Sequence, residues 1–249
     1  NKQTFLTLLA TFALLFSFTF SCHAKGKDKA KHVVFIGLDG WGAYSLPKAD
    51  MPNVKKLMED GAYTLKKRSA LPSSSAINWA SMFMGAGPEL HGYTEWGSKT
   101  PELPSRVLNK NGIFPTVFQL LRDARPEAEI GCLYEWEGIK YLVDTLSLSY
   151  HYHVADCNKT PKELGNMASS YIKEKHPALV AICYDGPDHT GHTAGHDTPE
   201  YYEKLKELDM YVGQIVQAVK DAGMLDDTIF ILTSDHGGID KGHGGKTMQ

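Results

Sequence analysis

The chain has 249 residues, of which 42% are hydrophobic, and its 26 lysine and arginine side chains are nearly balanced by 29 aspartates and glutamates, for a net charge of −3. Because acids and bases are well mixed, the sequence does not indicate the basic face with which proteins bind nucleic acids, and we expect no specific nucleic-acid partner. Three of the four cysteines, Cys132, Cys157 and Cys183, lie beyond the N-terminal segment. They form no short-spaced pair, which excludes a disulfide framework or a zinc knuckle.

The N-terminal segment is typical of a secretory signal, because an apolar stretch from Phe5 to Phe20 follows Lys2 and precedes small residues. We therefore expect a signal peptide over residues 1–24, a polar linker over 25–32, and an exported protein of the periplasm or cell envelope. Lipoprotein-type processing at Cys22 is an alternative, and it is the route by which we expect membrane association. About 225 residues remain, enough for one α/β domain over 33–249.

Strand and helix signals alternate along this domain. The predicted strands are 33–38, 129–134, 178–183 and 228–232, and the predicted helices are 52–60, a helix from about Ala76, 115–124, 161–175 and 199–222. This order favours a parallel sheet with helices packed on it. The runs 33–38, 178–183 and 228–232 are continuously apolar, which is typical of strands buried on both faces. The Gly- and Pro-containing stretch from Pro88 to Pro115 predicts an irregular loop.

Aspartate and histidine residues follow three of the predicted strands. They are found in Leu38-Asp39-Gly40, in Pro187-Asp188-His189-Thr190-Gly191-His192 and in Thr233-Ser234-Asp235-His236-Gly237-Gly238, with Gly242-His243-Gly244 shortly after. Open α/β sheets bind ligands at the carboxyl ends of their strands. A single Asp-His pair is equally typical of a strand-end cap, but three such motifs together predict a site for two divalent metal ions. The mixture of nitrogen and oxygen ligands favours Zn²⁺, and Mn²⁺ or Fe remains possible.

A polar turn, Ser73-Ser74-Ser75, precedes the helix predicted from about Ala76. The N-terminus of a helix attracts anions, so a phosphate group and a nucleophilic hydroxyl can meet there. A serine in this position is also a common helix N-cap. The residues alone do not select one of the three serines.

The order Ser75, Asn78, Gly85 and Pro88-Glu89-Leu90-His91-Gly92, together with the Pro-Asp-x-x-Gly-His and Thr-Ser-Asp-His-Gly motifs, resembles the alkaline phosphatase superfamily. The resemblance is greatest to its nucleotide pyrophosphatase/phosphodiesterase branch and covers most of the predicted mature chain. It implies an alkaline-phosphatase-like three-layer sandwich, with a mostly parallel central sheet and helices on both faces.

The same resemblance implies the roles of the site residues. It places the nucleophile on Ser75, one metal ion on Asp39, Ser75, Asp235 and His236, and a second on Asp188, His192 and His243. Metal coordination would activate the Ser75 hydroxyl for attack on phosphorus, and water would then hydrolyse the phosphoseryl intermediate. Asn78, one helical turn after Ser75, would donate to a phosphoryl oxygen. We expect His91, His189 and His196 to lie in loops or to support the ligands rather than to bind metal.

Two features depart from the family pattern. His243 comes seven positions after His236, whereas many members place the last histidine much farther along. The family normally continues with further strand and helix beyond the point where Gln249 ends this sequence, so the resemblance implies a fragment.

The substrate is expected to be a small phosphate ester, a nucleotide or another phosphodiester. No arginine accompanies the motifs to face the extra charge of a monoester, so we favour a phosphodiesterase or pyrophosphatase over an alkaline phosphatase-type phosphomonoesterase. Trp41, Trp79 and Tyr184 can line a pocket for the second ester group, or can simply be core residues. Two alternatives are a phosphotransferase that uses an alcohol or lipid acceptor and a non-catalytic exported metal- or phosphate-binding protein. The oligomeric state stays open.

Overall fold

The computed structural model describes residues 30–155 and 161–244. The predicted signal peptide, the lipidation alternative at Cys22, the linker as far as residue 29, and Cys157 lie outside the described residues. Within the described ranges, no helix is both long and apolar enough to cross a membrane.

Five parallel strands form one sheet in the order β3-β2-β4-β1-β5. The strands are β1 (His32–Leu38), β2 (Ile130–Tyr134), β3 (Tyr150–His153), β4 (Leu179–Tyr184) and β5 (Thr228–Thr233). The helices are α2 (Pro52–Asp60), α3 (Ser75–Met84), α4 (Pro88–His91), α5 (Val117–Ala124), α6 (Pro161–Lys175), α7 (Gly186–Ala194) and α8 (Pro199–Asp221). Four short 3₁₀ segments are η1 (Ala43–Ser45), η2 (Glu137–Tyr141), η3 (Thr145–Ser147) and η4 (Leu225–Asp227).

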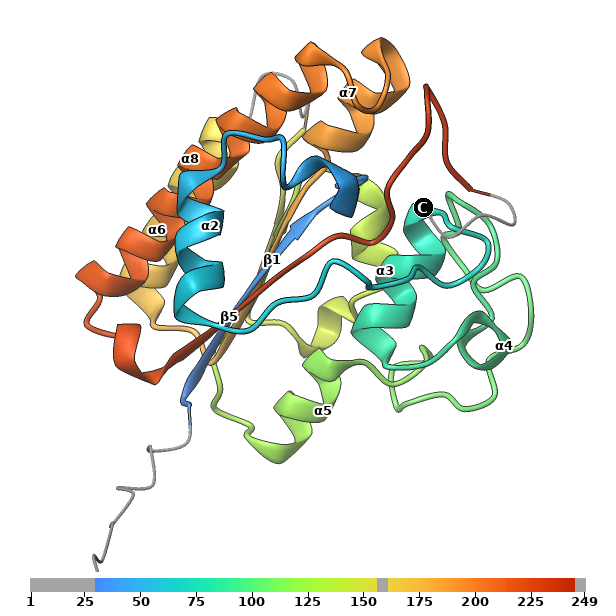
Figure 1. Cartoon of the computed structure of the whole chain (residues 1–249). Coiled ribbons are helices and arrows are strands. Elements are labelled where there is room, and N and C mark those ends of the chain that lie inside the picture. Colours follow the sequence, from blue (N-terminus) through green and yellow to red (C-terminus); the bar gives the residue numbers. More distant parts are fainter. Residues whose placement is uncertain (1–29, 156–160, 245–249) are drawn as a thin grey trace, which may run out of the picture.

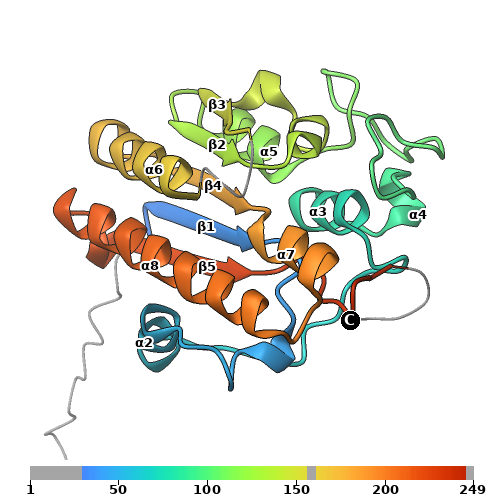
Figure 2. The ribbon, with the colours of Figure 1, turned by 90° about the horizontal axis from the view of Figure 1, so that it is seen from above.

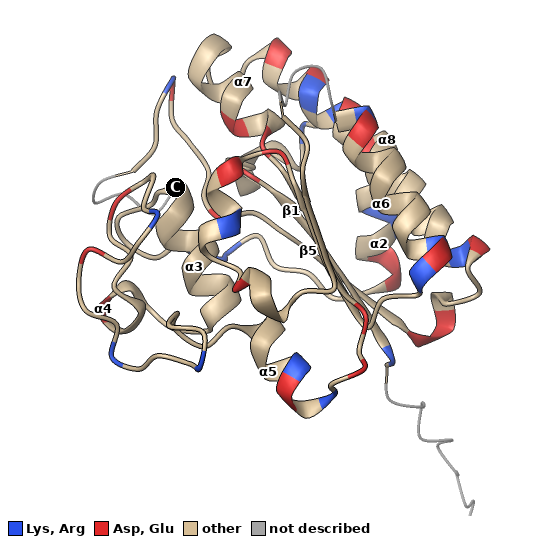
Figure 3. Ribbon diagram, turned by 180° about the vertical axis from the view of Figure 1, so that it is seen from behind, with Lys and Arg blue, Asp and Glu red and all other residues tan. Residues whose placement is uncertain are grey.

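The molecule has three layers (Figure 1, Figure 2). Helices α2, α6 and α8 cover one face of the sheet, and α3 and α5 cover the other. Side chains alternate across a strand, so Val34 and Ile36 of β1 pack toward α8 while Phe35 packs toward α3. The predicted α/β sandwich is therefore confirmed. Acidic and basic residues lie close together along α5 and α8 (Figure 3).

Trp79 of α3 is fully buried between the sheet and the site. Its ring stacks on Phe83 at 5.8 Å and meets Phe35 edge-on at 6.3 Å. Its Nε1 donates to Asp39 Oδ2 at 2.9 Å. One side chain thus belongs to both the aromatic core and the polar edge of the sheet.

Strand β5 differs from the prediction, because it is not buried on both faces. It lies at the edge of the sheet, where it pairs with β1, and Ile229 and Ile231 are 50% and 42% exposed. Phe230 and Leu232, which point to the opposite face, pack against the core beneath α8. An apolar run shows which side chains can be buried, but it does not show which strands and helices stand beside them.

Three elements were missed by the sequence patterns. Strand β3 was missed because its sequence Tyr-His-Tyr-His is polar and half-exposed. No helix was predicted for the motif from Gly186 to Ala194, which forms helix α7. The predicted irregular loop from Pro88 contains the single helical turn α4. The other boundaries differ from the expected ones by one or two residues.

Candidate active site

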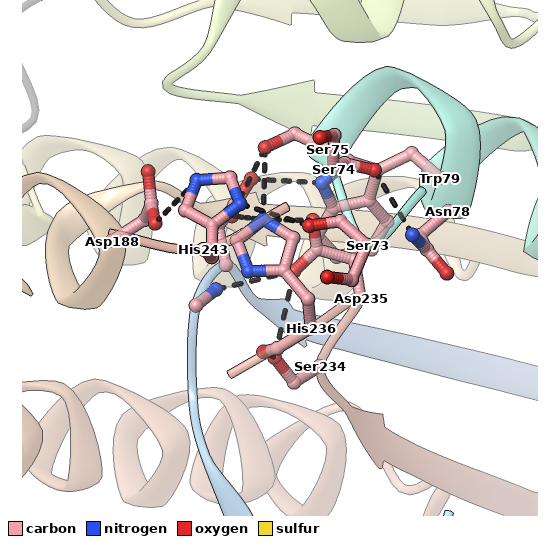
Figure 4. A network of polar contacts seen from close by, with 12 residues as sticks. Ser73, Ser74, Ser75, Asn78, Trp79, Asp188, Ser234, Asp235, His236 and His243 are labelled. Carbon is pink, nitrogen blue, oxygen red and sulfur yellow. Dashed lines mark hydrogen bonds and ion pairs between the residues drawn. The ribbon is translucent and has the colours of Figure 1, made fainter. Parts of the chain in front are cut away.

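The predicted site residues converge at the carboxyl edge of the sheet (Figure 4). Asp39 directly follows β1, and its backbone N–H extends the strand pairing by donating to Tyr184 O at 2.8 Å. Asp235 and His236 follow β5, and Gly40 N donates to Asp235 Oδ1 at 3.1 Å. Asp39, Asp235 and His236 are almost completely buried. The strand ends thus bring residues nearly two hundred positions apart into contact.

The first cluster consists of Asp39, Ser75, Asp235 and His236. His236 Nε2 lies 3.4 Å from Asp39 Oδ1, 3.2 Å from Asp235 Oδ2 and 3.1 Å from Ser75 Oγ. Ser75 Oγ is 3.5 Å from Asp39 Oδ1. The four side chains assigned by resemblance to one metal ion therefore surround one point.

The second cluster consists of Asp188, His192 and His243. The i,i+4 spacing along α7 places Asp188 and His192 on one helix face, with His192 Nε2 3.3 Å from Asp188 Oδ2. His243 Nε2 lies 3.4 Å from Asp188 Oδ1 and 3.1 Å from His192 Nε2. The rings of His236 and His243 stack at 3.7 Å, so the two clusters adjoin. The close position of His243 in the sequence therefore does not prevent it from reaching the site.

Backbone carbonyls orient all three histidines. The Nδ1 atoms of His192, His236 and His243 each lie 2.9 Å from a backbone oxygen, of Lys241, Gly237 and Ser73 respectively. A carbonyl only accepts, so each Nδ1 carries a proton and each ring turns its Nε2 toward the site. Burial, followed by the proximity of His236, lowers the pKa of His243 and favours the neutral form of this ring. Two Nε2 atoms 3.1 Å apart are the arrangement expected around a cation.

The carboxylates add negative charge that the protein does not balance. Burial, followed by the charges of Asp235 and Asp188, raises the pKa of Asp39 well above its ordinary value. Asp188 Oδ1 and Asp235 Oδ2 accept no hydrogen bond, and in the described part of the chain these two carboxylates and Asp39 form ion pairs only with histidine. Buried carboxylates beside imidazole nitrogens fit divalent cations. Both clusters can therefore hold a metal ion.

The three serines at the start of α3 have different surroundings. Ser74 is the N-cap residue and makes no capping bond with its side chain, while Ser75 is the first helical residue. Ser73 supports the loop of His243, because its carbonyl meets His243 Nδ1 and its Oγ accepts from Gly244 N at 3.2 Å. Ser75 is the serine whose hydroxyl faces the Asp/His cluster.

The side chain of Asn78 is bonded to the loop that precedes α3. Its Oδ1 accepts from Ala70 N at 2.6 Å, and its Nδ2 donates to Ser74 O at 3.0 Å, with longer contacts to the carbonyls of Ala70 and Pro72. The amide points away from the Asp/His clusters (Figure 4). One turn of helix brings this side chain beneath the loop that precedes α3, where it ties down the backbone instead of facing the mouth of the site.

Sequence reasoning missed two acidic residues beside the site. A carboxylate oxygen of Asp185 lies within 4.8 Å of those of Asp39 and Asp188. Glu135 is 4% exposed and accepts from Asp185 N at 2.7 Å, and burial raises the pKa of Glu135 to about 8. Both residues directly follow strands, so the rule that selected Asp39 could have found them.

Two other histidines, His91 and His196, make contacts within the protein that support nearby loops and helices. His91 bonds to Ser81 Oγ and to Tyr93 N, and burial lowers the pKa of His91 to about 4. His196 bonds through Nδ1 and its backbone N–H to Asp240 O, and its ring fills the space left by Gly191 and Gly238. These contacts place His196 between α7 and the loop that carries His243.

This parallel α/β sandwich, with serine, aspartate and histidine gathered at the carboxyl edge of the sheet, defines an alkaline-phosphatase-like protein. Residues 33–242 match the model of the type I phosphodiesterase/nucleotide pyrophosphatase family, and the chain belongs to that family.

Individual relatives are distant. The chain is 26% identical over 221 residues to bis(5'-adenosyl)-triphosphatase enpp4 of Mus musculus, covering 84% of this chain and 48% of that protein. It is 32% identical over 110 residues to GPI ethanolamine phosphate transferase 3 of Schizosaccharomyces pombe, and this match covers 43% of this chain and 11% of that protein. The chain thus spans about half the length of its enpp4 relative.

Solved structures with the same fold include murine ectonucleotide pyrophosphatase/phosphodiesterase 5, one of them an inactive variant in complex with AMP. The TM-score is 0.67 at 19% identity, with 83% of this chain and 57% of that one covered. At this identity the likeness establishes the fold alone.

Proposed function

We propose that this chain is a two-metal phosphoric ester hydrolase of the phosphodiesterase and nucleotide pyrophosphatase type, with Ser75 as its nucleophile. The observation that carries the proposal is the position of Ser75 Oγ, 3.1 Å from His236 Nε2 and 3.5 Å from Asp39 Oδ1. Membership of the type I phosphodiesterase family supports the reaction class. The apolar segment from Phe5 to Phe20 supports export as part of the same proposal.

Two divalent ions, with Zn²⁺ the best fit to the donor set, would be held by the two clusters. Asp39, Ser75, Asp235 and His236 would hold one, and Asp188, His192 and His243 the other. When bound, such ions stabilise negative charge on a nucleophilic oxygen and on phosphoryl oxygens. The backbone carbonyls behind the histidines keep their Nε2 atoms directed at the site.

The chain's own residues define the covalent steps. Ser75 Oγ forms a bond to phosphorus, the bond from phosphorus to the leaving oxygen breaks, and that oxygen leaves as an alcohol or a phosphate. Water then cleaves the phosphoseryl ester and restores the Ser75 hydroxyl. Asn78 keeps the preceding loop in place through Ser74 O, so we assign it a positioning role.

A diester or pyrophosphate substrate is favoured over a monoester. Lys67, which lies beside Asp235, already donates from Nζ to the Ser234 carbonyl, so part of its hydrogen-bonding capacity is used within the protein. A monoester carries one charge more than a diester at neutral pH and benefits more from such a cation. The alternative function is that of a phosphomonoesterase.

The test compares bis(p-nitrophenyl) phosphate with p-nitrophenyl phosphate as substrates of the zinc-loaded protein. We expect faster turnover of the diester, and its loss in Ser75→Ala and after chelation. Ser170→Ala, an exposed serine of α6, is the matched control and should keep full activity. Faster turnover of the monoester would favour the phosphomonoesterase, and the absence of Ser75-dependent turnover in a folded, zinc-loaded sample would favour a binding protein.

The match to a phosphate transferase supports a second candidate, in which an alcohol replaces water in the last step. Turnover of the diester in the presence of ethanolamine or glycerol separates the two. Hydrolysis releases inorganic or monoester phosphate in proportion to nitrophenol. Transfer would instead yield the phosphorylated alcohol as the main product.

A further inference from the structure

The backbone segment 40–42 touches all three carboxylates of the two clusters. It directly follows Asp39, and Gly40 N donates to Asp235 Oδ1 at 3.1 Å. Gly40 has a φ of +68°, and a Cβ built on it would lie only 2.7 Å from the Cα of Asp188. The Gly40 backbone is therefore packed directly against Asp188, and the position of segment 40–42 affects the spacing of the three carboxylates.

Tyr201 of α8 holds this segment from the side opposite the ligands. Its side chain is fully buried, and its hydroxyl donates to Gly40 O at 2.7 Å and accepts from Gly42 N at 3.1 Å. Burial raises the pKa of Tyr201, so the hydroxyl keeps the proton that it donates. One hydroxyl group thus binds both ends of the segment.

The segment is fixed between two well-anchored elements. Tyr201 lies in the first turn of α8, where its N–H donates to the Oγ1 of the N-cap residue Thr198 at 3.4 Å, and Leu205 one turn later is buried in the core. On the other side, Trp41 N donates to Ser234 Oγ at 2.9 Å, directly after β5. Because α8 and the end of β5 are both held by the core, the Tyr201 hydroxyl transmits the position of α8 to the site.

We propose that Tyr201 is a positioning residue, whose hydroxyl holds segment 40–42 so that Asp39, Asp188 and Asp235 keep the spacing with which they bind two metal ions. This inference rests on the proposed function and deepens it. It gives α8, which carries none of the proposed ligands, a part in forming the site. Loss of a group behind a metal ligand commonly weakens metal binding or activity by roughly 10- to 100-fold, and we expect a loss in this range.

Tyr201→Phe tests the proposal, because it removes the hydroxyl and keeps the ring, whose centroid lies 5.4 Å from that of His196. Competition with a chromophoric chelator should show zinc binding weakened by roughly 10- to 100-fold. With cobalt(II) in place of zinc, the visible absorption reports the arrangement of the ligands, and its bands should shift in this variant. At saturating zinc, kcat for the diester should fall by roughly tenfold, while KM stays within about twofold.

Tyr171→Phe is the matched control. It also removes a buried tyrosine hydroxyl, which donates to Glu129 Oε1 at 2.8 Å at the opposite, amino end of the sheet. This variant should lose stability and keep the zinc affinity and the cobalt spectrum of the wild-type protein. An unchanged zinc affinity and spectrum in Tyr201→Phe, or equal losses of zinc affinity in both variants, would overturn the proposal. If Tyr201→Phe is unfolded without metal, a zinc titration followed by circular dichroism gives the affinity for the same comparison.

The zinc and cobalt measurements separate this inference from the proposed function, because they need no turnover. If the wild-type protein binds zinc and hydrolyses no ester, the proposed function fails, and weaker zinc binding by Tyr201→Phe than by Tyr171→Phe still supports the positioning role. If the wild-type protein hydrolyses the diester and Tyr201→Phe binds zinc equally well, the positioning role alone fails. A folded wild-type protein that binds no zinc would overturn both.

Discussion

At the scale of single residues, the surroundings of Asn78 set its role. The amide is buried, and both of its ends are bound to the backbone of residues 70–74. The family resemblance implied that Asn78, one helical turn after Ser75, donates to the substrate. Spacing fixes the distance along the helix axis, but the preceding loop decides which way the side chain is used.

Replacing Asn78 should therefore reduce stability together with activity. Asn78→Ala leaves the Ala70 N–H without its partner and removes one of the two donors to the Ser74 carbonyl, and Asn78→Asp sets a carboxylate against that carbonyl. We expect each to lower the free energy of unfolding by about 2 kcal/mol. Urea unfolding, with Ser170→Ala as the control, measures this. Lost diester turnover with an unchanged unfolding midpoint would instead favour a direct role at the phosphoryl group.

At the scale of elements, the site depends on how α7 is fixed against the loop that follows β5. His196 joins them, because its ring contacts Gly191 and Gly238 and its Nδ1 and N–H both meet Asp240 O. The proposed ligands His192 and His243 lie on the two sides of this contact. Their relative position therefore depends on His196 even before a metal ion binds.

His196→Ala should weaken zinc binding by roughly 10- to 100-fold, as losses behind a metal ligand commonly do. His196→Phe keeps an aromatic ring in this position and loses only the bond from Nδ1 to Asp240 O. Its zinc affinity should therefore lie between those of the wild-type protein and His196→Ala. Zinc competition with a chromophoric chelator gives the affinities, and His151→Ala on the exposed side of β3 serves as the control. Unchanged zinc affinity in His196→Ala would show that α7 and the loop are held by other contacts.

Much of the order of strands and helices could be predicted from the sequence. Apolar runs identified β1, β4 and β5, and the strand-end rule with the family resemblance found the residues of both clusters. The rest depended on context. Strand β3 is polar because one edge of the sheet is half-exposed, and α7 could not be recognised because its Gly-, Pro- and His-rich sequence is a poor helix former that tertiary contacts stabilise.

At the scale of the whole molecule, the site is a concentration of buried carboxylates beside three imidazoles. Folding without cations leaves Asp39, Asp188 and Asp235 poorly compensated, so metal binding and folding are linked. With zinc a thousandfold above its Kd, the free energy of unfolding should rise by about 4 kcal/mol.

Thermal unfolding with zinc and with a chelator tests this linkage. We expect chelation to lower Tm in the wild-type protein. In Asp39→Asn, the difference between the Tm values with zinc and with chelator should be smaller. The substitution weakens metal binding and also removes a buried charge that disfavours the metal-free state. Equal Tm values with and without zinc in the wild-type protein would show that the carboxylates are compensated by the fold itself.

Trp79 couples the packing of the core to the position of Asp39. The same indole stacks on Phe83, meets Phe35 and donates to Asp39. A substitution at either phenylalanine that turned the indole would move a hydrogen bond on a proposed metal ligand. Core packing around Trp79 therefore cannot be changed without an effect on Asp39. The effects of substitutions at Phe35 or Phe83 should depend on which residue occupies position 39.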